Sequence, residues 1–133
     1  EVKPLHSAEE LYATCDVVSL HIPATPETKG SINHALLSLM PKGGLLVNTA
    51  RKEVINEDEL IQFMQERHDF RYVTDVMPAA DQKMHELFEG RYFATPKKMG
   101  AQTAEANINA GIAAAKQIVD FIENGNTRFQ VNK

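Results

Sequence analysis

The feature that most constrains the fold is a regular alternation of helix starts and short apolar runs, joined by short loops. Four strands are expected, at residues 16–20, 45–48, 70–76 and 92–94. Five helices are expected around them, at residues 7–15, 33–40, 56–67 and 82–89 and in a long stretch ending at 124. Alternation of this kind predicts parallel strands with right-handed crossovers. The predicted class is therefore α/β with a parallel sheet.

Local signals support these boundaries. Residues 7–10 and 56–59 have the capping-box pattern, in which an N-cap side chain and a glutamate three residues later exchange hydrogen bonds with the backbone. Asn33 is expected to cap the second helix, and Gly125 can take the left-handed position that ends the last one. Residues 45–48 form one continuous apolar run, so this strand is expected to be buried on both faces.

Composition excludes several classes of function. The chain of 133 residues has one domain's worth of length, and its net charge of −4 argues against a nucleic-acid partner. No apolar run approaches the roughly 20 residues that cross a bilayer, and the first four residues form no signal-peptide pattern. Cys15 is the single cysteine, which fits a reducing cytoplasm, and the five histidines lack metal-ligand spacing. We expect a cytoplasmic protein without a metal.

Candidate site residues follow the predicted strands. Ligands of open parallel sheets bind beyond the carboxyl ends of the strands. This rule selects four segments, which are residues 21–23, 49–51, 75 and 96–100. Together they offer cations, one carboxylate and backbone groups, and this combination suits an anionic substrate beside a polar cofactor ring.

Each of these signals is weak when taken alone. An arginine such as Arg51 is ordinarily a solvated loop residue, and the pair at 97–98 is ordinarily a solvated turn. Asp75 can equally cap a turn, and His21 fits a satisfied core histidine. Only their shared position at one edge of the sheet favours function.

Six blocks of sequence occur in the order and spacing of the D-2-hydroxyacid dehydrogenases. They are DVVSLHIP at 16–23, TPET at 25–28, LSLMPKGG at 37–44, VNTAR at 47–51, DV at 75–76 and GAQTAEA at 100–106. The chain resembles this family from about residue 7 to its end. The resemblance implies NAD as cofactor, a small 2-hydroxy acid as substrate, and a homodimer.

The family's glycine motif precedes the first of these blocks, and the chain contains no G-x-G-x-x-G. The resemblance therefore implies that an amino-terminal part is absent from this sequence. Residues 1–103 would be the C-terminal part of a Rossmann-like NAD-binding domain. Residues 104–133 would be a crossover helix and a piece of the substrate domain, with a short strand at 129–131. The residues that distinguish NAD from NADP would lie in the absent part.

The resemblance also assigns roles. Arg51 resembles the arginine that holds the substrate carboxylate and polarises its carbonyl, a task that suits a fork of donors. Asp75 resembles the carboxylate that receives the nicotinamide carboxamide. The cofactor contacts implied by the resemblance are those of His21, Pro23, Thr49, Asp75 and Gly100.

Two catalytic positions depart from the family pattern. An ungapped alignment puts Lys98 where the family has its acid/base histidine, and an alternative alignment puts Lys97 there. The family's orienting glutamate falls at Ala80, with Asp81 beside it. A lysine ammonium has no tautomers, so it does not need that glutamate as a histidine does. Whether another carboxylate replaces it is left open.

The lysine segment resembles a subgroup of short-form D-3-phosphoglycerate dehydrogenases. The expected reaction is the NAD-dependent oxidation of D-3-phosphoglycerate to 3-phosphohydroxypyruvate in serine biosynthesis, by hydride transfer at C2. Arg51 would bind the substrate and Lys98 would exchange the proton. The alternatives are a glyoxylate or hydroxypyruvate reductase and a non-enzymatic NAD-binding co-regulator. The isolated chain is expected to be inactive.

Overall fold

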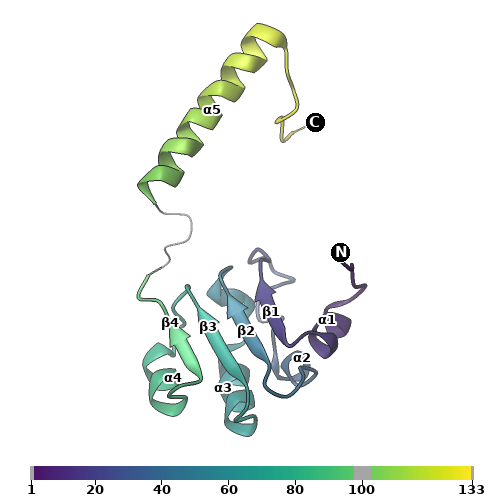
Figure 1. The fold of residues 1–133 in the computed structure, drawn as a ribbon, viewed down its shortest axis with the longest axis vertical. Helices are drawn as coiled ribbons and strands as arrows, with labels where there is room; N and C mark the ends of the chain where they lie inside the picture. Colours follow the sequence, from purple (N-terminus) through teal and green to yellow (C-terminus); the bar gives the residue numbers. More distant parts are fainter. Residues whose placement is uncertain (1, 98–102, 133) are drawn as a thin grey trace. The chain divides into compact units, whose positions relative to one another are not determined.

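The computed structural model describes residues 2–97 and 103–132, and the chain divides into two compact units, 1–98 and 99–133. The first unit is an α/β layer structure and the second contains one long helix (Figure 1). The first unit runs through α1 (Ala8–Thr14), β1 (Val17–Leu20), α2 (His34–Leu37), β2 (Leu45–Asn48), a 3-10 turn (Lys52–Val54), α3 (Glu57–Glu66), β3 (Arg71–Thr74), α4 (Asp81–Leu87) and β4 (Tyr92–Ala94). The second unit contains α5 (Ala104–Asn124).

The four strands form one parallel sheet in the order β1-β2-β3-β4. This confirms the predicted α/β class and the parallel pairing. The third strand is shorter than the expected 70–76, because the chain leaves the ladder after Thr74. There the Thr74 hydroxyl accepts a hydrogen bond from the Val76 N–H at 3.0 Å, which turns the backbone locally.

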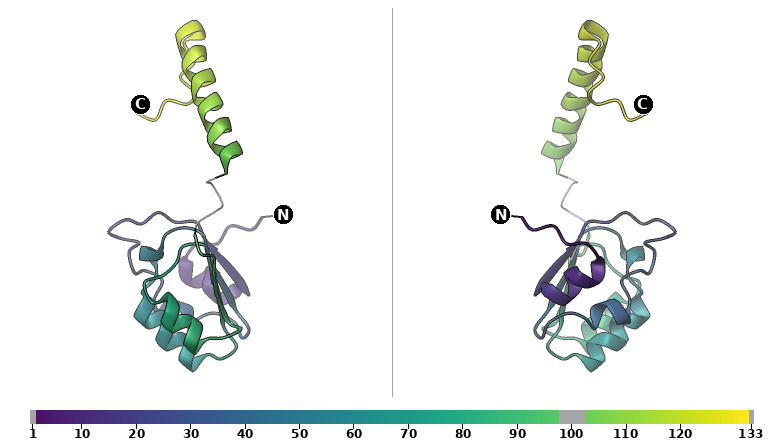
Figure 2. Two further views of the ribbon diagram at one scale, coloured as in Figure 1. Left: turned by 90° about the vertical axis from the view of Figure 1, so that its left-hand side faces the viewer. Right: turned by 90° about the vertical axis from the view of Figure 1, so that its right-hand side faces the viewer.

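Helices α2, α3 and α4 cover one face of the sheet (Figure 2), and the core lies between these layers. The largest fully buried side chains include Tyr72, Phe63, Phe70, Phe88, Leu46 and Met64. Helix α1 adds the buried Tyr12 beside α2. Burial of this apolar surface is the main favourable term in folding, at roughly 25 cal/mol per Å² removed from water.

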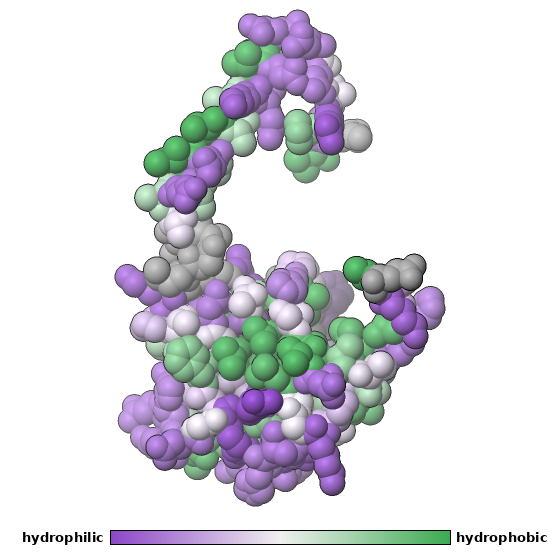
Figure 3. Space-filling model, viewed as in Figure 1, coloured by the Kyte–Doolittle hydropathy of each residue, from purple (hydrophilic) through white to green (hydrophobic). Residues whose placement is uncertain are grey.

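The opposite face of the sheet carries an apolar patch across the strands (Figure 3). Val17 and Phe93 are each 56% exposed, and Leu45 and Val47 are half-buried. The expectation that residues 45–48 are buried on both faces is therefore only half correct. All the crossover helices of residues 2–97 lie on the other side of the sheet.

The capping side chains act as the sequence predicts. Ser7, Asn33 and Asn56 each accept a hydrogen bond from the backbone N–H three residues later, at 3.1, 2.9 and 3.3 Å. In the first capping box the Glu10 carboxylate reaches back to the N–H of His6. The glutamate therefore accepts the N–H of the residue before the N-cap, whereas in the standard capping box it accepts the N–H of the N-cap itself.

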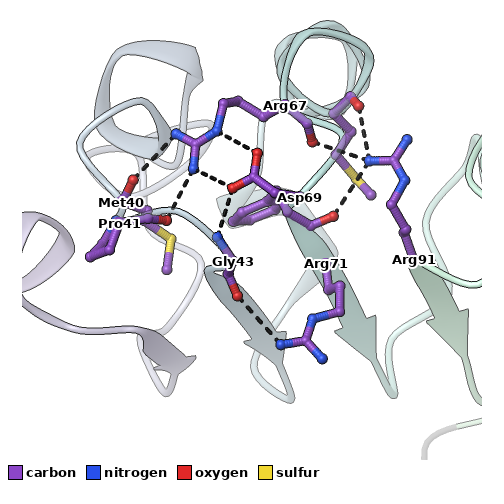
Figure 4. Close-up of polar contacts among 9 residues, drawn as sticks. Met40, Pro41, Gly43, Arg67, Asp69, Arg71 and Arg91 are labelled. Atoms are coloured by element: carbon purple, nitrogen blue, oxygen red, sulfur yellow. Dashed lines mark hydrogen bonds and ion pairs between the residues drawn. The ribbon is translucent and has the colours of Figure 1, made fainter.

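A cluster of polar groups joins the turns at the amino ends of β2 and β3 (Figure 4). The Arg67 guanidinium donates to both oxygens of Asp69 at 2.9 and 2.8 Å, and to the carbonyls of Met40 and Pro41. Asp69 also accepts the N–H of Gly43 at 2.7 Å. The hydrogen bonds from Arg67, followed by the one from Gly43, hold the pKa of Asp69 well below its usual range.

The second unit has an exposed apolar surface. Helix α5 ends at Asn124 and is capped by Gly125, whose φ of 65° is the left-handed conformation expected there. Its apolar residues Ile108 and Ile122 are 61% and 73% exposed. Residues 129–131 form no strand within residues 103–132: Arg128 and Phe129 lie in a turn, and the Gln130 N–H donates to the carbonyl of Thr127 at 3.0 Å. The expected pairing of this segment with a substrate domain stays a prediction. In the described part of the chain, no helix is long and apolar enough to cross a membrane.

Candidate functional site

Two loops at the carboxyl ends of neighbouring strands meet around an open cavity of about 520 Å³. Its lining residues are His21, Ile22, Pro23 and Ala24 after β1, and Thr49, Ala50 and Arg51 after β2. The structure therefore brings together four residues to which the sequence analysis gave a role, and one of them is a cation. They are His21, Pro23, Thr49 and Arg51. Parallel pairing of β1 with β2 puts both loops at the same edge.

Arg51 lies just before the 3-10 turn and lines this cavity. The side chain is exposed, and the hydrogen bond that its guanidinium makes within the described residues runs from Nη1 to the carbonyl of Ala50 at 3.2 Å. A guanidinium has five N–H donors in a planar fork. Donors therefore remain for a bound carboxylate, which matches the geometry of that fork.

The buried residue Asn48 shapes the arginine loop. Its Nδ2 donates to the carbonyl of Arg51 at 3.1 Å, and its Oδ1 accepts the N–H of Ala50 at 3.0 Å. Asn48 is fully buried, so these bonds are shielded from competition with water. Sequence reasoning counted Asn48 as part of an apolar strand and missed this role. The available signal was an amide at an inward-facing position of that strand.

Asp75 follows β3 at the same edge of the sheet. Its N–H donates to the carbonyl of Asn48 at 3.2 Å. Its Oδ1 is shielded from solvent and has no hydrogen-bond partner among the described residues. Leaving a buried acceptor unpaired costs about 1–3 kcal/mol. The site therefore suits a ligand that supplies an N–H donor, as the carboxamide of a nicotinamide would. Asp75 does not line the cavity formed by the first two loops.

The first loop is held by its own side chains. His21 is exposed, and its Nε2 lies 2.9 Å from the Ser19 hydroxyl. The alternative interpretation of His21 as a core histidine is therefore wrong. The carbonyl of Pro23 accepts a hydrogen bond from the Thr28 hydroxyl at 2.6 Å. These contacts keep the loop ordered beside the cavity while its outer backbone stays accessible.

The fourth segment is described only in part. Lys98 and Gly100, which the sequence assigned to catalysis and to cofactor binding, lie outside the described residues. Lys97 is exposed, and its carbonyl accepts the Thr95 hydroxyl at 3.2 Å. The choice between Lys97 and Lys98 and the expected proximity of Lys98 to Arg51 therefore stay predictions.

The carboxylate next to the missing glutamate position is engaged elsewhere. Asp81 accepts a hydrogen bond from the Tyr92 hydroxyl at 2.5 Å and lies 3.6 Å from Nε2 of His85. Burial, and after it the bond to Asp81, raises the pKa of Tyr92 above its usual value, so the phenol keeps the proton that it donates. Asp81 thus joins α4 to β4. In the described residues no group of histidine, cysteine, aspartate and glutamate side chains could hold a metal ion.

Comparisons with known proteins point to one family. The family described as D-isomer specific 2-hydroxyacid dehydrogenase, NAD binding domain, matches residues 1–96. A D-3-phosphoglycerate dehydrogenase of Haemophilus influenzae is 35% identical over 136 aligned positions, which cover 98% of this chain and 33% of that protein. An erythronate-4-phosphate dehydrogenase of a Shewanella species is 39% identical over 98 positions, which cover 71% of this chain and 36% of that protein.

A solved structure gives the same result. The crystal structure of 3-phosphoglycerate dehydrogenase from Entamoeba histolytica with NAD+ bound is similar at a TM-score of 0.83 and 53% identity. The similarity covers 97% of this chain and 42% of that one. The chain thus spans about a third of the length of the curated relatives. The expectation of NAD as cofactor is confirmed at the level of the family.

Proposed function

Because this chain belongs to the NAD-binding domain family of the D-isomer specific 2-hydroxyacid dehydrogenases, we propose that its protein passes a hydride between NAD and C2 of a 2-hydroxy acid. One observation carries the proposal. Arg51 meets the loop after β1 around one cavity. At the same edge, the Asp75 oxygen that has no partner among the described residues follows the next strand. A fork of donors for an acid and an acceptor for a carboxamide are two of the groups that this reaction requires.

We propose the following division of work. NAD supplies or accepts the hydride when it is bound. Arg51 holds the carboxylate of the acid and polarises the carbonyl of the keto form, because a fork of charged donors suits both oxygens. Asp75 orients the nicotinamide by accepting its carboxamide N–H, with His21, Pro23, Thr49 and Gly100 as further cofactor contacts. Lys98 exchanges the proton of the C2 hydroxyl.

The proposed domain division follows from the same membership. Residues 1–103 would form the C-terminal part of the NAD-binding domain, and residues 104–133 would carry the chain into a substrate domain. The division of the chain into units at residues 98 and 99 supports a boundary near this point. We also propose a cytoplasmic location and a homodimer.

The favoured substrate is D-3-phosphoglycerate, which would place the protein in serine biosynthesis. Relatives named for this activity support the choice. The relative named erythronate-4-phosphate dehydrogenase favours a second candidate, since its substrate is also a phosphorylated 2-hydroxy acid. A glyoxylate or hydroxypyruvate reductase and a co-regulator that only binds NAD remain the alternatives.

The experiment is an assay of NADH formation by the natural full-length protein. D-3-Phosphoglycerate and erythronate 4-phosphate would be compared as substrates, with glyoxylate and hydroxypyruvate tested in the reducing direction. We expect kcat/KM for D-3-phosphoglycerate to exceed that of the other three. Binding of NAD+ without turnover of any of the four compounds would instead favour the co-regulator.

A further inference from the structure

The segment from Asp75 to the start of α4 is fixed at its beginning by the neighbouring strand. The Thr74 hydroxyl donates to the carbonyl of Asn48 at 2.9 Å and accepts the N–H of Val76 at 3.0 Å. Thr74 and Asn48 are both almost fully buried. This anchor sets where the backbone of Asp75 begins, but it does not reach the later residues of the segment.

The far end of the segment is fixed by Glu57, the first residue of α3. Its Oε1 accepts the N–H of Ala79 at 3.0 Å and its Oε2 accepts the N–H of Ala80 at 3.1 Å. Ala80 is the N-cap of α4 and makes no side-chain capping bond. The carboxylate of another helix therefore accepts the N–H of the N-cap residue and of the residue before it, just ahead of the first turn of α4.

Both oxygens of Glu57 are needed for this contact. A carboxylate only accepts hydrogen bonds, whereas a glutamine amide would turn an NH₂ group toward one of the two backbone donors. The nearer carboxylate in the sequence, Asp81, is held by Tyr92 at 2.5 Å. Glu57 is therefore the carboxylate that contacts the backbone at Ala80, the position at which the family pattern has its glutamate.

We propose that Glu57 is a positioning residue for the nicotinamide site, which it serves by fixing the segment that carries Asp75. This inference rests on the proposed function, in which Asp75 accepts the nicotinamide carboxamide. The arginine loop is anchored separately by Asn48. Loss of Glu57 therefore weakens the hold on NAD+ and slows hydride transfer, and it leaves the hold of Arg51 on the acid unchanged.

The test uses the full-length protein with Glu57→Gln, Glu57→Ala and a matched control, Asp58→Asn. Asp58 is exposed on the same first turn of α3, so its replacement removes an equal charge near the same helix end. Without this bond the segment is less ordered in the free protein, and NAD+ binding must order it. An ordering cost of about 1.4 kcal/mol would raise the Kd for NAD+ about tenfold in Glu57→Gln, and we expect a larger rise in Glu57→Ala. Amide exchange at Ala79 and Ala80 accelerates in both variants, while the KM for the acid stays unchanged.

The outcomes separate this inference from the proposed function. Unchanged NAD+ affinity and unchanged exchange at Ala79 and Ala80 in Glu57→Gln would overturn the inference, as would an equal loss in Asp58→Asn. A wild-type protein that binds NAD+ but oxidises no 2-hydroxy acid would defeat the proposed function, and the NAD+ titrations would still decide the role of Glu57. If Glu57→Ala does not fold, the near-isosteric Glu57→Gln carries the test. A wild-type protein that does not bind NAD+ would overturn both.

Discussion

At the scale of single residues, buried polar side chains support the functional groups of the candidate site. Arg51 reaches solvent, and the backbone on either side of it is held by the fully buried Asn48. Asp75 follows the buried Thr74, which donates to the carbonyl of the same asparagine. Local backbone geometry and access to a ligand are thus assigned to different residues. A substitution of an exposed group should therefore change binding more than folding.

Arg51→Lys tests this separation. A single ammonium cannot reproduce a two-pronged hold on a carboxylate. One to three charged contacts are at stake, each worth roughly 1.5–3 kcal/mol, so kcat/KM for the acid should fall about 10²-fold or more. The unfolding temperature should not change, since the side chain is exposed. Steady-state kinetics and thermal unfolding of the full-length protein provide the measurement, with Lys52→Ala as a control cation on the same loop. An Arg51→Lys enzyme with normal kcat/KM would exclude Arg51 from substrate binding.

The adjacent lysines Lys97 and Lys98 make a second pair of variants. If Lys98 is the acid/base group, Lys98→Ala should lose about 10²–10⁴-fold in kcat in both directions, and Lys97→Ala should be far milder. Oxidation requires a neutral lysine, whose free side chain titrates near ~10.4. The wild-type oxidation rate should therefore rise with pH into the alkaline range. The reverse pattern would show that the alignment is wrong by one residue, and full activity of both variants would remove lysine from the chemistry.

At the scale of elements, the sequence predicted the helices and strands better than their contacts. Capping side chains and apolar runs are local signals, so α1, α3 and β2 begin and end close to the predicted residues. The bond from Glu57 to the backbone of Ala79 and Ala80 joins residues 22 and 23 positions apart. No periodicity reports such a pairing. The strand expected at 129–131 also depends on a distant partner, because a strand exists only where another accepts its hydrogen bonds, and the expected partner is the substrate domain.

The turn cluster at the amino ends of the strands should make stability depend on pH. Hydrogen bonds from Arg67 lower the pKa of Asp69 in the folded protein. A carboxylate with a lowered folded-state pKa adds stability that is complete above its unfolded value, near ~3.9, and is lost as the pH falls through the folded value. Asp69→Asn should therefore lower the free energy of unfolding by about 1 kcal/mol at neutral pH, a modest value because the pair is partly exposed.

The check compares thermal unfolding of wild type and Asp69→Asn at neutral pH and at about pH 3. The difference between the two proteins should shrink at the lower pH, where the unfolded state takes up the proton. Asp58→Asn, which removes an exposed carboxylate from α3, controls for the change in net charge. A difference that stays constant between the two pH values would show that the Arg67–Asp69 pair does not act through charge.

At the scale of the whole molecule, each unit presents apolar surface to solvent. The face of the sheet away from α2, α3 and α4 exposes Val17 and Phe93, and α5 has no buried residue. The chain also spans only about a third of the length of its curated relatives. Sequence alone assigned the fold class and selected the edge of the sheet at which the candidate residues lie, because strand alternation and parallel pairing determine both. The sequence could not show which apolar surfaces are exposed in this chain, because exposure depends on contacts between distant residues and not on the alternation of strands and helices.

The 133-residue chain by itself is expected not to oxidise D-3-phosphoglycerate. Its sequence contains no glycine-rich loop to receive a pyrophosphate, and such a loop with its helix start supplies most of that binding site. Arg51 and Asp75 could then contact the acid and the nicotinamide ring, but the rest of the cofactor would lack a site. NADH formation by the purified chain would be compared with that of the full-length protein at equal molar concentration. Measurable turnover by the chain alone would contradict the prediction, because it would mean that residues 1–133 hold NAD+ without a phosphate-binding loop.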